Sequence, residues 1–355
     1  MKKVLKMLLI LLLVVVLAVG GLLGWLTVTE YKPADLETVS VVSKTAGSPK
    51  LSPDGEISVL SWNIGYGGLG KDSDFFMDGG KSARSADKMQ VSEYLAGIYS
   101  TIYNSEARPD LILLQEVDIN SSRTYSVDER ELLAAGNSAF ALNYSCPFVP
   151  MPFPPMARVN SGLFTTTDYA IDSAERIQLP CPFSWPLRIA NLKRCLLVSY
   201  IPLEGTDKQL VLVNLHLEAY DDEGEGRLAQ TRQLSDFLQS EYAKGNYVIA
   251  GGDFNSIFPG GLEAYPNEHP ENWIPGVLTD DMLPESWSFL CDLSVPSCRL
   301  LNQPYDPSDT ANTQYYVIDG YIVSPNVTVQ TVETLDLAFA NSDHNPVRLV
   351  VTLAP

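Results

Sequence analysis

The sequence predicts one α/β domain of two packed sheets flanked by helices, preceded by a separate apolar helix at the N-terminus. Many short apolar runs of strand length recur along the chain, whereas only two segments show helical spacing. The apolar start is set apart by its length and by its lack of charge. At 355 residues the chain can bury a sizeable core, and a single sandwich domain of about 300 residues fits this length.

The N-terminal run spans residues 7–28 and follows Lys2, Lys3 and Lys6. It is long enough to cross a hydrocarbon core of about 30 Å, and the basic residues should remain in the cytoplasm. The alternative is a cleaved secretory signal with the small residues Ala18 to Gly20 at its cleavage site. The rest of the chain is exoplasmic in both cases, in a single-pass protein of the cell membrane or in a secreted one.

The next segment, residues 29–56, is polar, contains Pro33, Pro49 and Pro53, and shows no clear periodicity. We therefore expect a linker between the N-terminal segment, residues 1–28, and a domain over residues 57–355.

Two helices are expected within this domain, over residues 85–106 and 227–244, with Pro109 beyond the end of the first and Gly245 at the end of the second. The strand candidates are short runs rich in β-branched and other apolar residues. They cover residues 57–63, 110–116, 160–165, 196–201, 210–217, 247–250, 316–323, 328–335 and 347–353.

The charge and the cysteine content of the chain disfavour some classes of ligand and site. With 24 Lys and Arg against 43 Asp and Glu, the formal net charge is −19, and such a surface disfavours a nucleic acid ligand. Acidity that only keeps an exported protein soluble is the alternative explanation. The five cysteines include no CxxC pair, which argues against a zinc-thiolate site. Cys291 and Cys298 either close a short loop or remain free thiols.

Polar residues end several of the predicted strands, as they do where α/β enzymes assemble a site. Gly251-Gly252-Asp253-Phe254-Asn255 follows an apolar strand, and Ser342-Asp343-His344-Asn345-Pro346 precedes another. Asn63 and Glu116 end two further strands, and His216 lies near the end of a third.

Further signals are a carboxylate inside an apolar strand, Asp319, and a short β-rich segment that begins at Asn160. In this order, from residue 57 to residue 353, the chain resembles the endonuclease/exonuclease/phosphatase superfamily, the deoxyribonuclease I-like and sphingomyelinase-like metal-dependent phosphoesterases. Each motif alone is commonplace, but six in the order of the family are specific. The resemblance implies a four-layer α/β/β/α sandwich of two mainly antiparallel sheets.

The resemblance also implies a divalent cation, Mg²⁺ or Mn²⁺. Glu116 is the first expected ligand, Asp343 should lie near the metal, and Asn63 should help to place the metal or the phosphate. Oxygen ligands suit a hard cation that keeps several of its waters.

By the same resemblance, Asp253 orients or deprotonates the attacking water and Asn255 donates to a phosphoryl oxygen. His344 contacts the phosphoryl group, and Asp319 is the expected acceptor for its other ring nitrogen, because a buried carboxylate needs a partner. Whether Asp253 or His344 is the general base stays open.

Two weaker assignments complete the site. The family commonly has Asn-Thr-His-Leu where this chain has Asn214-Leu215-His216-Leu217, so we keep His216 as a phosphate contact. Asn160 falls in a looser part of the family pattern and is assigned to substrate binding.

We therefore expect a membrane-anchored, exoplasmic, metal-dependent phosphoesterase, with phosphodiester chemistry preferred over monoester chemistry. A phospholipid headgroup or another small phosphodiester is favoured over nucleic acid, and no protein partner is predicted. The alternatives are an extracellular nuclease of the same fold and a catalytically silent binding module. A silent relative should have lost Glu116, Asp253 or His344, and this chain retains all three.

Overall fold

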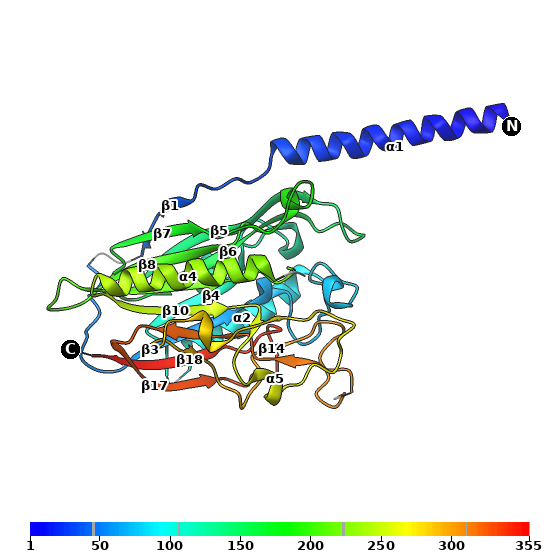
Figure 1. Ribbon diagram of the computed structural model, residues 1–355. Helices are drawn as coiled ribbons and strands as arrows, with labels where there is room; N and C mark the ends of the chain where they lie inside the picture. The colour runs from blue at the N-terminus through cyan, green and yellow to red at the C-terminus, as the bar shows by residue number, and fades with distance from the viewer. Residues whose placement is uncertain (45–46, 106, 222–223, 310, 355) are drawn as a thin grey trace.

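Two seven-stranded sheets face each other in the computed structural model, with helices on their outer sides (Figure 1). The structure describes residues 1–355 except 45–46, 106, 222–223, 310 and 355. Every neighbouring pair of strands in the two large sheets is antiparallel except β9 with β10 and β3 with β4. The predicted sandwich of two mainly antiparallel sheets is confirmed.

The first sheet has the order β1-β7-β8-β9-β10-β16-β13. Its strands are Leu36–Val39, Ser173–Gln178, Cys195–Pro202, Gln209–His216, Tyr247–Asp253, Asp319–Val323 and Phe289–Leu290. The second sheet has the order β17-β18-β3-β4-β6-β5-β2. Its strands are Val327–Thr334, Val347–Leu353, Ile57–Asn63, Leu111–Asp118, Ala157–Thr167, Asn137–Val149 and Val42–Ser43.

The apolar runs are continuous because both faces of the central strands are buried. Along β3, Val59 packs between the two sheets, while Leu60 packs under helix α2. Along β9, Leu212 packs between the sheets and Val213 under helix α4. This alternation gives the domain three packed interfaces between four layers. Burying each such side chain stabilises the fold by about 1.5–3 kcal/mol relative to leaving it exposed.

Helix α2 covers Lys88–Tyr103 and α4 covers Glu225–Ala243. The side chain of Asp87 caps α2 by accepting a hydrogen bond from the Gln90 backbone N–H at 2.9 Å. This cap starts α2 three residues later than the sequence predicts. The smaller elements are α3 (Glu129–Leu133), α5 (Gly261–Ala264), β11 (Ser256–Ile257), β12 (Gly276–Val277), β14 (Cys298–Arg299) and β15 (Tyr315–Tyr316).

The segment over residues 29–56 is part of the domain and not the linker that the sequence suggests. Strand β1 pairs with β7 and β2 pairs with β5, and Leu51 is buried between the sheets. These strands are short and lie at the edges of their sheets, where one row of backbone groups stays unpaired and prolines are tolerated. Such strands show no apolar run, which is why they escape a pattern search.

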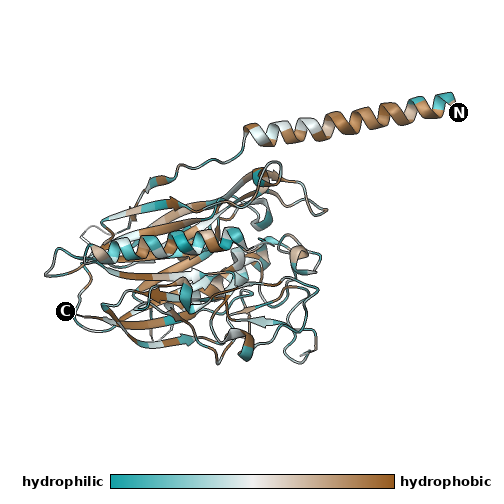
Figure 2. Ribbon diagram, viewed as in Figure 1, coloured by the Kyte–Doolittle hydropathy of each residue, from teal (hydrophilic) through white to brown (hydrophobic). Residues whose placement is uncertain are grey.

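The N-terminal helix α1, Lys2–Val28, is apolar along nearly its whole length (Figure 2). It is long and apolar enough to cross a membrane, a property that signal sequences share. Its residues are exposed up to position 21, whereas Leu22, Leu23 and Leu26 pack against the domain. All five cysteines are free, so Cys291 and Cys298 do not close a loop.

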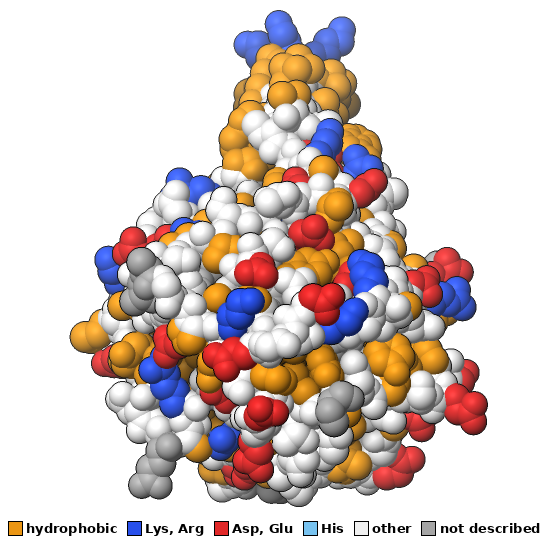
Figure 3. Space-filling model, turned by 90° about the vertical axis from the view of Figure 1, so that its left-hand side faces the viewer, with side chains coloured by type: hydrophobic (Ala, Val, Ile, Leu, Met, Phe, Trp, Pro, Cys, Tyr) orange, Lys and Arg blue, Asp and Glu red, His pale blue; other side chains and the backbone are white. Residues whose placement is uncertain are grey.

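At the end of the domain where the C-terminus lies, acidic and basic side chains are intermixed over the surface (Figure 3). The same view shows the basic tip of α1 beyond a collar of hydrophobic side chains.

Candidate active site

The ends of five strands meet at one end of the sandwich and place the predicted residues side by side. In the first sheet, Asp253 on β10 lies opposite His216 on the parallel strand β9 and opposite Asp319 on the antiparallel strand β16. In the second sheet, Asn63 ends β3, and Glu116 lies near the end of the parallel neighbour β4. The two sheets therefore contribute to one site.

Asn63 joins the two halves of this site. Its Nδ2 donates to Asp253 Oδ2 at 3.0 Å and to Glu116 Oε1 at 3.2 Å, while its Oδ1 accepts from the backbone N–H of Gly65. The side chain is 1% exposed. Asn63 thus fixes the distance between a carboxylate of each sheet.

Two of the predicted residues have backbone conformations that L-amino acids rarely adopt. Glu116 has φ 56° and lies within the β-bulge of β4, and Asn255 has φ 46°. Positive φ costs a non-glycine residue of the order of 1 kcal/mol or more and clusters at functional sites. The bulge lets Glu116 leave the alternation of the strand and line the pocket.

The two glycines before Asp253 are explained by close packing. A Cβ on Gly251 would lie 2.5 Å from the ring of Tyr321, and one on Gly252 would lie 1.9 Å from the backbone oxygen of Leu215. Neither distance is possible for a real Cβ, so this end of β10 approaches its neighbours only with glycine.

His344 is held by a buried carboxylate. Its Nδ1 lies 2.8 Å from Asp319 Oδ2, and the same oxygen accepts a hydrogen bond from Ser297 Oγ at 2.7 Å. Its Nε2 faces Asp253 Oδ2 at 3.8 Å and Asp343 Oδ2 at 3.9 Å. Burial acts to lower the pKa of His344. The charge and hydrogen bond of Asp319, together with the charges of Cys298 and Asp343, outweigh burial and hold this pKa well above the ordinary value.

The other titratable groups are perturbed mainly by burial. Burial and the negative charge of Asp319 raise the pKa of Asp253 to about 6. Burial raises the pKa of Asp343 to about 7, with a further contribution from Glu116. Burial also lowers the pKa of His216 well below its ordinary value, so this ring is neutral at pH 7. His216 Nε2 lies 3.3 Å from Asp253 Oδ2.

Glu116 and Asp343 offer carboxylate oxygens, the kind of ligand that a hard divalent cation takes. Asp343 and Glu116 both line the pocket, and the pKa of Asp343 is raised by burial and, to a smaller extent, by the charge of Glu116, a cost that a bound cation would reduce. Among the described residues, two groups have ligand atoms within 4.8 Å of one another: Asp253 with Asp319 and His344, and Cys298 with Asp343 and His344. The second group includes Asp343, one of the predicted metal residues, whereas Glu116, the first expected ligand, belongs to neither.

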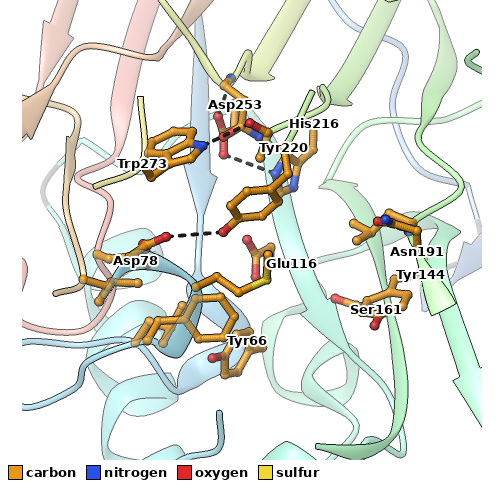
Figure 4. A pocket seen from close by; sticks show the side chains of 18 of the residues that line it. Tyr66, Asp78, Glu116, Tyr144, Ser161, Asn191, His216, Tyr220, Asp253 and Trp273 are labelled. Carbon is orange, nitrogen blue, oxygen red and sulfur yellow. Dashed lines mark hydrogen bonds and ion pairs between the residues drawn. The ribbon is translucent and has the colours of Figure 1, made fainter. Parts of the chain in front are cut away.

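A cavity of about 420 Å³ opens at this site. Figure 4 shows Glu116 near its centre, between Tyr66 and Tyr220. The polar part is lined by the predicted residues Glu116, His216, Asp253, Asn255, Asp343 and His344. The apolar part is lined by Phe75, Phe76, Met77, Val149, Met156, Phe183, Leu187 and Leu192.

Several pocket residues were not predicted, because they come from loops without a motif. Tyr220 OH lies 3.3 Å from Asp78 Oδ1 across the pocket, and Trp273 Nε1 donates to the backbone oxygen of Ala219 at 3.0 Å (Figure 4). Asp78 lies in a glycine-rich segment after Asn63, and Trp273 lies in a segment rich in Pro and Asn, compositions typical of loops.

Buried donors in the pocket also escaped prediction. Arg194 Nη1, Asn143 Nδ2 and Ser161 Oγ line it or lie beside it, and none has a hydrogen-bond partner among the described residues. Ser161 takes the position expected for Asn160, whose Oδ1 instead accepts from Ser145 Oγ at 2.9 Å. Successive side chains of a strand point to opposite faces, so Ser161 lines the pocket and the structure does not bring the Asn160 side chain into it.

Residues 60–351 match the sequence profile of the Endonuclease/Exonuclease/phosphatase family. The chain belongs to this family. The family consists of phosphoesterases and nucleases that generally depend on divalent metals, so the chain is a phosphoesterase of the superfamily. The resemblance seen in the order of the motifs is thereby confirmed. No curated protein sequence matches the chain.

Solved structures of the endonuclease/exonuclease/phosphatase superfamily share the fold at low identity. One from Beutenbergia cavernae is 16% identical, has a TM-score of 0.51, and aligns over 84% of this chain and 72% of its own. One from Bacteroides vulgatus is 16% identical with a TM-score of 0.50, over 84% and 100% of the two chains. ANGEL2, described as a 2′,3′-cyclic phosphatase in complex with adenosine-2′,3′-vanadate, is 13% identical with a TM-score of 0.52, over 89% and 99%.

Proposed function

We propose that this chain is a divalent-metal-dependent phosphodiesterase that α1 holds in a membrane, with its catalytic domain on the exoplasmic side. Its substrate would be a phospholipid headgroup ester or another small phosphodiester. The observation that carries the proposal is the joining of Glu116, Asn63, Asp253 and His344 at one end of a pocket whose remaining wall is largely apolar.

Glu116 and Asp343 would hold the metal, with Asn63 beside them. A bound Mg²⁺ or Mn²⁺ would polarise a phosphoryl oxygen and stabilise the charge that develops on it. The two carboxylates agree with the chemistry of a hard cation, while Asn63, whose Nδ2 donates to Glu116, would position the Glu116 carboxylate.

We assign the two proton-transfer roles to different residues, His344 and Asp253. The Nδ1 proton of His344 is fixed by Asp319, and its Nε2 lies between two carboxylates, which favours a ring that donates a hydrogen bond to a phosphoryl oxygen. Asp253 accepts a hydrogen bond from Asn63 and would orient the attacking water and take up its proton. Asn255 lines the same pocket and could donate to a phosphoryl oxygen, although one N–H of its amide already donates to the backbone oxygen of Leu217.

The apolar wall and the charge favour a lipid-like or small substrate. The pocket places Phe75, Phe76 and Phe183 near the catalytic groups, and a net charge of −19 repels a polyanion. The membrane-spanning length of α1 would keep the domain close to phospholipid.

A substrate panel tests this proposal on the full chain in detergent or in vesicles. It should include phosphatidylcholine, sphingomyelin, bis(p-nitrophenyl) phosphate, p-nitrophenyl phosphate, single-stranded DNA and RNA, each with Mg²⁺, Mn²⁺ or EDTA. We expect metal-dependent hydrolysis of diesters that EDTA abolishes, and Asp253→Asn controls for contaminating activity. Rapid cleavage of DNA or RNA without phospholipid turnover would establish the nuclease instead, and inactivity with every metal would establish a silent binding module.

A further inference from the structure

Two neighbouring loop segments carry large hydrophobic side chains that are exposed to solvent. The loop between β5 and β6 carries Met151 and Phe153, which are 64% and 93% exposed, and the segment after β7 carries Trp185 and Leu187, which are 55% and 67% exposed. Exposed apolar side chains that gather on neighbouring loops often form an interaction surface for a protein, a membrane or a ligand. We call these four residues the apolar rim.

The apolar rim is attached to the end of α1. Trp185 Nε1 donates to Thr27 Oγ1 at 3.1 Å, and Leu26 is buried in a cluster with Met156 and Ile189, which belong to the two rim segments or follow them directly. These contacts fix the direction in which α1 leaves the domain.

An ion-pair cluster strengthens the attachment just after the helix. The carboxylate of Glu30 lies 2.9 Å from Arg188 Nε and 3.4 Å from Lys193 Nζ, and its side chain is 1% exposed. Since Arg188 follows Leu187 directly, the helix end and the apolar rim form one unit.

The length of free helix says where a bilayer would begin. The apolar part of α1 covers residues 7–28, and residues 7–21 are exposed. At 1.5 Å per residue this exposed part spans about 22 Å of a hydrocarbon core about 30 Å thick, so residues 22–28, several of which pack against the domain, are needed to complete the span. In Figure 1, α1 extends beyond the end of the sandwich that carries β14 and α5, the end at which the site lies. A bilayer that the apolar part of α1 spans would therefore reach the apolar rim, because residues 22–28 lie beside it.

The wall of the pocket continues into this surface. Leu187 of the apolar rim lines the pocket, as do Met156 after the first loop and Phe183 before Trp185. The opposite end of the domain is charged and mixed in sign (Figure 3). An apolar path therefore leads from the rim to the catalytic groups.

We infer that the apolar rim inserts into the outer leaflet of the same bilayer that α1 spans, so that the pocket opens directly onto the membrane. The inference rests on the proposed function and narrows it to a phosphodiester lipid of that leaflet. The phosphate would reach Asp253 and His344 while the apolar part of the lipid stays along the wall that leads to Leu187. Trp185 would sit at the level of the headgroups, where tryptophan is enriched.

The position of Trp185 can be measured without any activity. The full chain is reconstituted into vesicles that contain lipids brominated near the top of the acyl chain, and tryptophan fluorescence is compared with that in unbrominated vesicles. We expect Trp185→Phe to lose a large part of the quenched signal. Trp287→Phe is the matched control, because Trp287 is 7% exposed and packs in the core beneath α4, so it should remove only unquenched signal.

A pair of rim substitutions tests delivery of the lipid. Met151→Ser with Phe153→Ser should slow hydrolysis of lipid in the bilayer about tenfold, because insertion loses two apolar side chains. Hydrolysis of bis(p-nitrophenyl) phosphate should stay unchanged, since neither residue lines the pocket. Val42→Ser is the matched control: Val42 is 59% exposed and pairs with Ser138, at the opposite end of β5 from the rim loop.

The outcomes separate the two proposals. Unquenched Trp185 in the native chain, or lipid hydrolysis that the rim substitutions leave intact, overturns the inference. A native chain that hydrolyses no phosphodiester overturns the proposed function, and the quenching still decides whether the rim lies in the membrane.

Discussion

At the scale of single residues, the site depends on contacts between side chains that no short segment contains. Asp319 and His344 are 25 residues apart and meet through one hydrogen bond of 2.8 Å. Ser297 Oγ donates a hydrogen bond to the same carboxylate and accepts hydrogen bonds from the backbone N–H groups of Ile318 and Asp319. The ring of His344 is thereby oriented with Nε2 toward Asp253.

We expect Asp319→Asn to lower turnover about a hundredfold while the fold remains, because the amide favours the wrong tautomer or holds the ring weakly. His344→Ala should cost at least as much, and the double variant should cost little more than His344→Ala alone. Steady-state kinetics on bis(p-nitrophenyl) phosphate measures this, with KM and kcat separated. If the double variant instead shows the product of the two single losses, the residues act independently.

Residue-scale prediction succeeded where strands fix the geometry and failed where loops do. Asp253, His216 and Asp319 could be grouped because each ends or begins an apolar run, and neighbouring strands bring such ends together. Tyr220 and Arg194 follow or precede strands without any patterned spacing. Their place in the pocket depends on the conformation of the loops, and hydrophobic periodicity and amino-acid composition do not predict that conformation.

At the scale of elements, the C-terminal end of α1 and the strands that follow it pack against the domain. Sequence patterns found the central strands, whose two buried faces give continuous apolar runs, and missed β5 and β7, whose polar residues interrupt the pattern. They also missed β1, which is short and lies at a sheet edge. Because β1 pairs with β7, a fragment that begins near residue 41 would lose an edge strand.

The Glu30 cluster gives this attachment a pH dependence. Burial acts to raise the pKa of Glu30, but the hydrogen bond from Arg188 and the charge of Lys193 lower it below its usual value of 4.5. A lowered folded-state pKa means stability that is fully present above pH 4.5 and lost as the pH falls through the lowered pKa. We therefore expect Glu30→Gln to lower the thermal unfolding midpoint at pH 7, with a difference from the native chain that shrinks in acid.

Thermal scans of the full chain in detergent between pH 7 and pH 3 would measure this difference. Glu263→Gln is the control, because Glu263 on α5 is exposed and should not change the midpoint at any pH. A Glu30→Gln midpoint that matches the native one at pH 7 would show that the cluster contributes nothing to stability.

At the scale of the whole molecule, two sheets are locked together by buried polar contacts directly behind the site. Gln115 Nε2 donates to Asn214 Oδ1 at 2.8 Å, and Asn214 Nδ2 donates to the backbone oxygens of Leu114 and Phe164 at 3.1 Å. Buried hydrogen bonds between elements favour the one arrangement in which they form. The site therefore requires both sheets in one register, with Glu116 from one and Asp253 from the other.

The proposed chemistry depends on a divalent cation held by Glu116. The most direct test is the dependence of bis(p-nitrophenyl) phosphate hydrolysis on Mg²⁺ concentration for the native full chain, Glu116→Gln and the control Glu131→Gln, whose carboxylate is exposed on α3. We predict that Glu116→Gln raises the half-saturating Mg²⁺ concentration at least tenfold and lowers maximal turnover, because the substitution keeps the shape and removes the charge. Glu131→Gln should match the native chain. A Glu116→Gln variant with the Mg²⁺ dependence and turnover of the native chain would contradict this account.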